Sequence, residues 1–314
     1  MSDQSIIEYT LEQLKKQGVD KASCGLSNSQ KQELNIEHGE MSLFRTTFNS
    51  SLSIEAFINN KKGSTTINKT DKDSINNAVN KVIELSNSSN PDDCYGIAEH
   101  QPSQTFSCGS EEANLDTMYD SLSEFNEYVK NKFPKIILEA AILDFTKTNS
   151  IIANSNGINF KVNRGLYGFG PMFTAKEGKD TSSFNYTGFC AKKINKPLHK
   201  YTMIEQLLKE TEEQIKTFPI KDKFIGDIIV TPDCLGDFLS MIEGHISDFM
   251  IISGRSMYKD KLNQSIANEK LTLHSHPLSE KLDYNYFVTG DGYVCDNSTI
   301  IEKGILKTLL LGIY

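Results

Sequence analysis

The clearest indication of the fold lies in residues 33–63, ELNIEHGEMSLFRTTFNSSLSIEAFINNKKG. Leu34 and Ile36 fall on one side of an extended chain with polar residues between them, and the alternation returns at Leu52–Ile58. Gly39 and Asn59–Gly63 supply turns of the kind that join antiparallel strands. The pattern predicts an antiparallel sheet with these strands: Ala22–Ser27, Gln32–Glu37, Leu43–Thr47, Leu52–Ile58 and Ser64–Ile67.

One helix is predicted before these strands in the chain and another after them. The first has an apolar face and ends at Gly18, a typical helix terminus; its face is Ile6, Ile7, Leu11 and Leu14. The second opens at Thr70 as N-cap with Asp73 as capping-box partner, and its face is Ile75, Val79, Val82 and Ile83. Residues 1–88 are therefore expected to form an N-terminal α+β domain, a sandwich of helices and antiparallel sheet.

Residues 89–112 form the best linker candidate, because they contain Pro and Ser and show no apolar periodicity. The pair Asp92-Asp93 lacks a nearby third carboxylate, so a solvated turn is favoured over a cation site.

A β-rich middle domain is predicted for residues 113–219. It opens with a helix that Pro134 ends, and its strands turn at Asn156-Gly157. Gly165, Gly168 and Gly170 are expected to be strand glycines, because no helix follows them as in a phosphate loop. The predicted elements are a helix over Leu115–Val129, strands at Ile136–Lys147, Ile151-Ile152, Ile158–Val162, Leu166–Ala175 and Ser182–Ala191, and a helix over Tyr201–Ile215.

The C-terminal domain is predicted to cover residues 220–314. A short buried strand, Asp227–Thr231, feeds a long helix from Asp233 to near Gly254 with this buried face: Leu235, Phe238, Leu239, Ile242, Ile246 and Phe249. Strands follow at Lys270–Leu273, Tyr284–Val288, Tyr293-Val294 and Ile305–Ile313. The chain stops on an apolar stretch, so we expect a further domain or a partner to complete it. The whole is of the α+β class, with β-rich middle and C-terminal segments and a few long helices.

The sequence provides three candidate metal ligands, His245, His274 and His276. His245 follows Glu243-Gly244 in the long helix and has no second His within a turn or two, which favours a structural histidine. His274 and His276 share one face of a strand, which is a chelating geometry without an evident third ligand. Convergence of all three would build a three-His zinc site. Without it we expect no catalytic, cofactor-binding or metal-binding residues in this chain.

Composition narrows the classes of partner. The net charge of −8 argues against direct nucleic-acid binding, whose usual footprint is basic. The six Cys form no CxxC pair, which fits reduced thiols and a cytoplasmic protein. The polar, acidic N-terminus is unlike a signal peptide, and no apolar run is long enough to span a membrane.

Residues 33–63 resemble the opening signature of the TldD/PmbA family, in which a strand, a Gly-Glu turn and a second strand precede a glycine-containing turn. The resemblance continues in order through Asp71–Asp93, Ile152–Gly157, Gly254–Leu262 and Lys303–Tyr314. It therefore covers nearly the whole chain, although family members normally continue past this point.

The resemblance implies one of two kinds of subunit. The TldD kind resembles a metalloprotease, with an HExxxH helix that binds zinc. The PmbA (TldE) kind lacks the motif and is its partner in a dimer that cleaves unfolded peptides. With His245 set on the second His of the motif, Ser240 and Met241 stand where the first His and the Glu belong. The chain is therefore similar to the PmbA/TldE kind, with zinc expected in a TldD-like partner.

Two alternatives remain open. The chain could be a peptidase with another site, but Cys234 and His245, eleven residues apart on one helix, would be separated by ~16 Å along the axis. It could instead be a protein-binding modulator of DNA gyrase, as was once suggested for family members. The expected partners are a TldD-like subunit or a second copy of the chain, together with an unfolded peptide.

Overall fold

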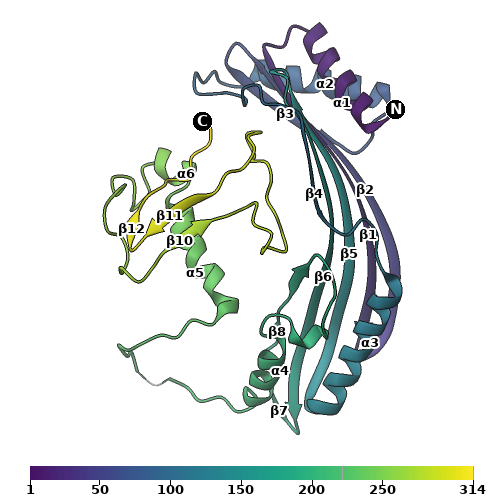
Figure 1. The fold of residues 1–314 in the computed structure, drawn as a ribbon, viewed down its shortest axis with the longest axis vertical. Coiled ribbons are helices and arrows are strands. Elements are labelled where there is room, and N and C mark those ends of the chain that lie inside the picture. The colour runs from purple at the N-terminus through teal and green to yellow at the C-terminus, as the bar shows by residue number, and fades with distance from the viewer. Residues whose placement is uncertain (221, 314) are drawn as a thin grey trace.

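The computed structural model describes residues 1–220 and 222–313, and a long curved sheet is its main element (Figure 1). Four long strands form the centre of the sheet: β1 (Lys21–Glu37), β2 (Glu40–Ile58), β5 (Ile136–Asn154) and β6 (Asn159–Glu177). The strand order is β3-β2-β1-β5-β6-β4, with β3 (Lys61–Ile67) at one edge and β4 (Gln104–Gly109) parallel to β6 at the other. Three short strands also pair with β6: β7 (Asp180–Thr181), β8 (Asn185–Tyr186) and β9 (Phe189–Ala191).

Each long strand joins segments that the sequence predicted separately. β1, for example, runs through both Ala22–Ser27 and Gln32–Glu37. The polar residues between them interrupt the alternation, but the backbone pairs with β2 and β5 without a break at that point. A tight turn at His38 and Gly39, both with positive φ, then leads into β2.

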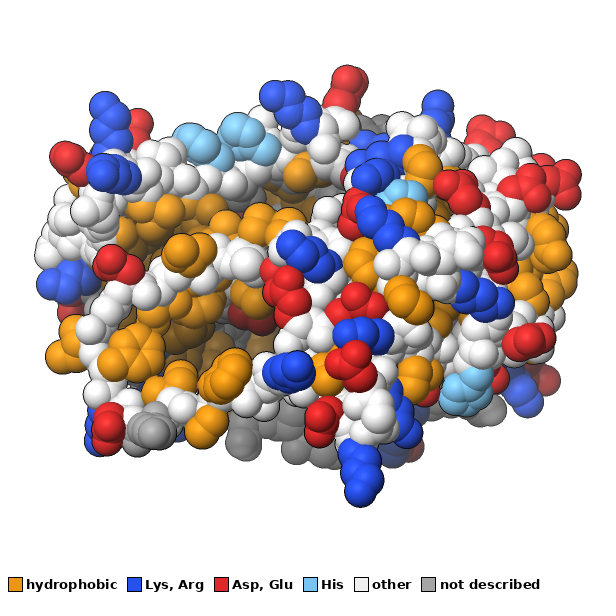
Figure 2. Space-filling view, turned by 90° about the horizontal axis from the view of Figure 1, so that it is seen from below, with side chains coloured by type: hydrophobic (Ala, Val, Ile, Leu, Met, Phe, Trp, Pro, Cys, Tyr) orange, Lys and Arg blue, Asp and Glu red, His pale blue; other side chains and the backbone are white. Residues whose placement is uncertain are grey.

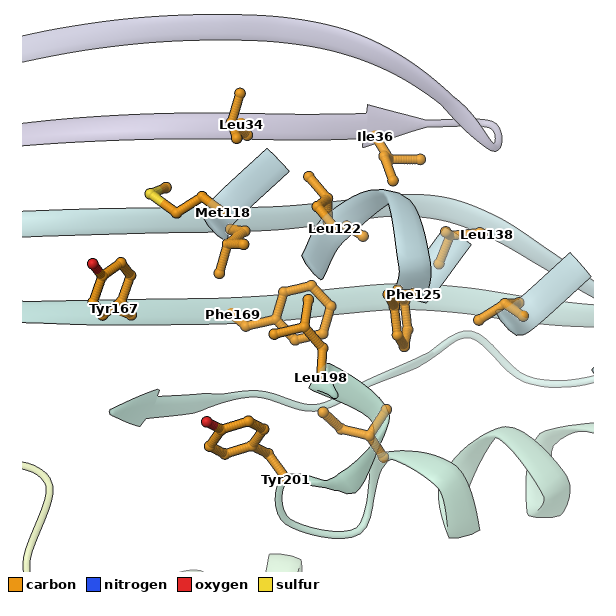
Figure 3. Packing of buried hydrophobic residues seen from close by; sticks show 14 of the residues in the cluster. Leu34, Ile36, Met118, Leu122, Phe125, Leu138, Tyr167, Phe169, Leu198 and Tyr201 are labelled. Carbon is orange, nitrogen blue, oxygen red and sulfur yellow. The ribbon is translucent and has the colours of Figure 1, made fainter. Parts of the chain in front are cut away.

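Four helices cover one face of the sheet at its two ends. α1 (Asp3–Lys16) and α2 (Lys72–Ser88) pack at one end, where their apolar residues meet Cys24, Leu26 and Ile54. α3 (Leu115–Lys132) and α4 (Ile204–Glu213), with the short 3-10 helix η1 (Leu198–Lys200), pack at the other end. Leu34 and Ile36 of β1 point into that second cluster, as Figure 3 shows. Since residues 24, 26, 34 and 36 of one strand share a face, all four helices lie on the same side.

The C-terminal segment packs against the opposite face and lies within the curve of the sheet (Figure 1). Phe160 and Val162 of β6 meet Phe287 and Val288 there. The segment contains α5 (Pro232–His245), α6 (Asp248–Ile252) and a small sheet of β10 (Leu273–Ser275), β11 (Ser298–Glu302) and β12 (Ile305–Leu306). The α+β fold class is confirmed.

Several predicted elements are wrong in detail. Residues 104–109 of the expected linker form β4, and the capping residue of α2 is Asp71 in place of Thr70. The region predicted as one strand over Ser182–Ala191 contains two short strands, β8 and β9. The strands predicted at residues 284–288 and 293–294 are instead parts of a loop that contains one isolated bridge, between Val288 and Val294. Side-chain contacts of Phe287 and Val288 hold this loop on the sheet. The strand expected over Ile305–Ile313 is limited to β12, and Tyr314 lies outside the described residues.

The predicted long helix after Asp233 also differs from the structure. It breaks after His245, and α6 starts at Asp248. Ile246 is buried, but Leu235, Phe238 and Phe249 are 46%, 52% and 68% exposed. The preceding segment forms no strand, and its Ile228 and Ile229 are exposed. Apolar periodicity identified a face correctly, but the described part of the chain does not cover that face.

The sheet is continuous through the division expected near residues 89–112, because β1 pairs with β5 along their length. The four-part domain division itself stays a prediction. Among the described residues, no helix is both long enough and apolar enough to cross a membrane.

Candidate functional site

α5 carries the positions that the sequence singled out for zinc chemistry. Thr231 precedes the helix in an extended conformation and Pro232 occupies its first turn, where the missing amide hydrogen costs nothing. None of the residues of α5 is buried. The Ser240 hydroxyl donates to the Asp237 carbonyl at 2.7 Å, and Met241 is 67% exposed. Neither side chain can do the work of an imidazole ligand or a carboxylate base.

His245 lies at the end of α5 and joins it to the chain that follows α6. The Met257 amide donates to His245 Nδ1 at 3.5 Å, which is at the weak limit of a hydrogen bond. The Ser256 hydroxyl donates to the His245 carbonyl, and the Tyr258 ring stands edge-on at 6.0 Å. These contacts are those of a histidine that holds a turn together.

His274 and His276 lie side by side, as the sequence predicted, with ring centroids 5.2 Å apart. His274 Nδ1 is 3.0 Å from the Thr299 hydroxyl on β11. Within residues 1–220 and 222–313, no three His, Cys, Asp or Glu side chains are grouped so that they could hold a metal ion. The structure therefore does not bring His245 into a three-ligand cluster with the other two.

Cys234 is exposed near the start of α5, and all six cysteines are free thiols. Because Cys234 and His245 occupy opposite ends of one regular helix, the separation of ~16 Å along the axis holds. That pair cannot act as nucleophile and base.

A cavity that sequence reasoning missed lies between the sheet and the 286–292 loop, with a volume of about 590 Å³. Its sheet wall contains an ion pair, Glu55 with Lys62 at 2.7 Å, and the Ser23 hydroxyl donates to Glu55 at 3.0 Å. Its loop wall is the predicted turn Gly290-Asp291-Gly292, where Asp291 accepts from the Ile313 amide at 3.2 Å. The sequence indicated only the turn at residues 290–292. It could not indicate the cavity, because the strands that form the other wall lie far from this turn in the chain.

Arg164 fixes the C-terminal segment on the sheet near this cavity. Its guanidinium donates to the Asn285 carbonyl at 3.2 Å and lies over the rings of Tyr284 and Phe287. The buried Asn285 side chain donates in turn to the carbonyls of Pro277 and Ser279. This polar network and the apolar cluster below it hold the loop in place.

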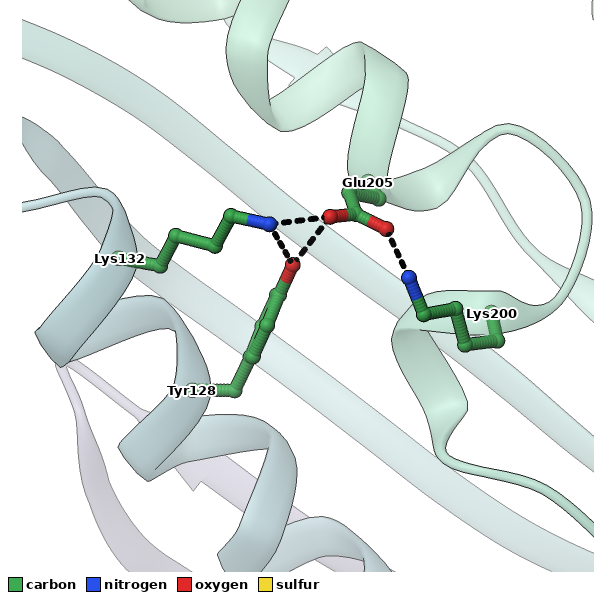
Figure 4. A network of polar contacts seen from close by, with 4 residues as sticks. All are labelled: Tyr128, Lys132, Lys200 and Glu205. Atoms are coloured by element: carbon green, nitrogen blue, oxygen red, sulfur yellow. Dashed lines mark hydrogen bonds and ion pairs between the residues drawn. The ribbon is translucent and has the colours of Figure 1, made fainter.

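A second titratable cluster joins α3 to η1 and α4, shown in Figure 4. The Glu205 carboxylate accepts hydrogen bonds from Lys132, from Lys200 at 2.6 Å and from the Tyr128 hydroxyl at 2.6 Å. Lys132, followed by Lys200, holds the pKa of Glu205 far below its usual range. The His199 ring stacks on Tyr128 at 3.6 Å, and burial lowers its pKa. The side chains of Tyr128, Lys132, Lys200 and Glu205 are paired with one another, which indicates a structural role, whereas His199 Nδ1 is buried without a hydrogen-bond partner among the described residues.

The comparisons with known proteins agree with this architecture. Over 98% of this chain, the fold is similar to that of TldE from Thermococcus kodakarensis (TM-score 0.77, 14% identity, 69% of that chain covered). Over 99% of this chain, it is similar to a putative modulator of DNA gyrase from Bacteroides thetaiotaomicron (TM-score 0.79, 16% identity, 72% of that chain covered). At these identities the two likenesses show the fold of the chain.

Family models identify the class more closely. Residues 22–86 match the PmbA/TldA metallopeptidase domain 1, and residues 225–314 match the PmbA/TldA metallopeptidase C-terminal domain. A metalloprotease of Methanocaldococcus jannaschii is 32% identical over 91 residues, a match that spans 29% of this chain and 20% of the metalloprotease. The chain belongs to the TldD/PmbA family.

Proposed function

We propose that this chain is a non-catalytic, PmbA/TldE-like subunit that holds unfolded peptide for a zinc-bearing metalloprotease partner. The observation that carries the proposal is α5. Ser240 and Met241 occupy the positions where the zinc motif would need a ligand and a base, on a helix that keeps its regular geometry.

The exposed apolar side of α5 supports a partner subunit. Leu235, Phe238 and Met241 are 46%, 52% and 67% exposed, and the segment before α5 exposes Phe224 and Ile225 as well. Figure 2 shows hydrophobic side chains gathered around a hollow on the face seen from below, the side on which this segment crosses. Apolar patches of this kind mark interaction surfaces. A TldD-like chain, or a second copy, is the partner that the family suggests.

The test is co-purification and peptide cleavage after co-expression with an HExxxH-bearing relative from the same source. We expect cleavage of a labelled unfolded peptide only by the pair. Phe238→Ser on α5 should weaken pairing, whereas the control Phe184→Ser should not, since Phe184 is exposed to a similar extent (54%) on another element. Cleavage by this chain alone would refute the proposal.

A further inference from the structure

A buried histidine lies where η1 packs against α3. His199 is 8% exposed, and its ring stacks on Tyr128 of α3 with 3.6 Å between the ring centroids and 7° between the ring planes. The neighbouring Leu198 and Tyr201 belong to the apolar cluster under α3, which also contains residues of α4. Residues 198–201, the η1 contact, therefore connect α4 to α3, and the imidazole lies inside this contact.

The imidazole lacks a hydrogen bond that its cationic form would need. Among residues 1–220 and 222–313, no group is a hydrogen-bond partner for the buried His199 Nδ1. A neutral imidazole can leave this nitrogen as a bare acceptor, but an imidazolium carries an N–H on both ring nitrogens. Protonation would therefore bury a donor for which the described chain offers no acceptor, and would also remove a charge from water. The packing of the η1 contact favours the neutral ring.

The charged groups around the ring act in opposite directions (Figure 4). Lys200 on η1 and Lys132 on α3 oppose a further positive charge, whereas Glu205 on α4 and Glu124 on α3 favour one. The Glu205 carboxylate already accepts hydrogen bonds from both lysines and from the hydroxyl of the stacked tyrosine. Burial is the largest influence on the imidazole, and it lowers the pKa of His199.

We propose that His199 makes the docking of η1 and α4 on α3 sensitive to pH, so that the η1 contact is tight when the imidazole is neutral and loosens when it is protonated. An undocked η1 would expose the ring to water, where a histidine takes up a proton near pH ~6.5. The docked ring resists the proton for the reasons given above. The undocked form therefore binds more protons, and docking weakens as the pH falls through about 6.5.

The size of the effect has an upper limit. At pH 5.5 an exposed imidazole is about 90% protonated, so the population of the undocked form can rise by no more than about tenfold relative to neutral pH. Glu205 does not contribute over this range, because its pKa is held far below it. The inference goes beyond the proposed subunit role and does not depend on it. α4 precedes α5 in the chain, so acid would loosen the support of the segment that leads to α5.

The test is native-state hydrogen exchange of the full chain at pH 7.5 and at pH 5.5, read by mass spectrometry and corrected for the intrinsic pH dependence of exchange. Two amides report on the η1 contact and on α4. Lys200 N–H donates to the Pro197 carbonyl at 2.9 Å, and Leu207 N–H donates to the Met203 carbonyl at 2.8 Å. We expect the corrected exchange of both to rise several-fold at pH 5.5.

Two variants assign the effect to this imidazole. His199→Phe keeps a ring on Tyr128 but cannot take up a proton, so it should abolish the rise at pH 5.5. His276→Phe, the matched control, replaces an exposed histidine of the C-terminal segment and should leave the rise as it is in the parent chain. Equal exchange at the two pH values in the parent chain, or an undiminished rise in His199→Phe, would overturn the inference.

A titration of the parent chain decides the matter if His199→Phe does not fold. The His199 ring is followed by NMR from pH 7.5 to pH 5, in the folded chain and in the chain unfolded by urea. The inference predicts a lower titration midpoint in the folded chain. A folded-state midpoint equal to or above the unfolded one would overturn it, because the docked ring would then accept the proton as readily as a ring in water.

Discussion

Phe287→Ala should loosen the 285–295 loop while leaving the rest of the sheet intact. Phe287 is 8% exposed, stacks on Phe106 at 5.1 Å between ring centroids, and lies under the Arg164 guanidinium. Truncation of a buried phenylalanine to alanine costs roughly 3–5 kcal/mol, and about 3 kcal/mol is expected here because the site lies at the rim of its cluster. A local opening free energy lowered by that amount raises exchange rates about 100-fold, at roughly 1.4 kcal/mol per factor of ten.

Native-state hydrogen exchange read by mass spectrometry is the assay. Two amides report on the loop: Cys295 N–H donates to the Phe287 carbonyl at 2.8 Å, and Thr289 N–H donates to the Tyr293 carbonyl at 2.8 Å. The matched control is Phe125→Ala, which removes an equally large buried ring from the cluster under α3. It should speed exchange in α3 without changing the loop. Unchanged exchange in the loop of Phe287→Ala, or an equal rise in the control, would refute this account of how the C-terminal segment is held.

Two further changes test other contacts. Glu205→Gln should lower the free energy of unfolding at pH 7 by about 1 kcal/mol, since it removes partly exposed ion pairs with Lys132 and Lys200. The folded-state pKa of Glu205 lies below its unfolded value near 4.3, so this contribution is fully present above about pH 5 and lost as the pH falls below about 4. Urea unfolding should show the two proteins converging in acid; a difference that persists or grows there would contradict the assignment. Gly63→Ala should destabilise the α2 end of the sheet by roughly 2 kcal/mol or more, because a Cβ would stand 2.2 Å from the Val82 carbonyl oxygen. A thermal midpoint unchanged by Gly63→Ala would show that α2 is not packed as described.

The sequence predicted a strand or helix correctly where the element has one buried face and one face in water, because apolar and polar residues then alternate in a recognisable pattern. Apolar and polar residues alternate clearly at the two ends of β1, because each end packs under a pair of helices. The middle of β1 does not alternate, since Asn28 and Gln30 lie between the two helix clusters, and its strand structure comes from pairing with strands distant in sequence. β4 was missed for the same reason: its pairing with β6 lies outside any local pattern.

The candidate site was predictable in part. The proximity of His274 and His276 follows from their two-residue spacing along an extended chain, and their rings lie 5.2 Å apart, although β10 ends at Ser275 and His276 lies beyond it. Their separation from His245 and the cavity beside Asp291 depend on how distant segments meet. The burial expected for the face of α5 failed because periodicity shows that a face is apolar and not what covers it.

We propose that this chain contributes no zinc site of its own, and the zinc content of the purified chain, alone and with its HExxxH-bearing relative, tests this proposal most directly. The account predicts zinc in the co-purified pair and none in the lone chain, with no change on His245→Ala. Zinc near one equivalent in the lone chain, lost on His245→Ala, would contradict it.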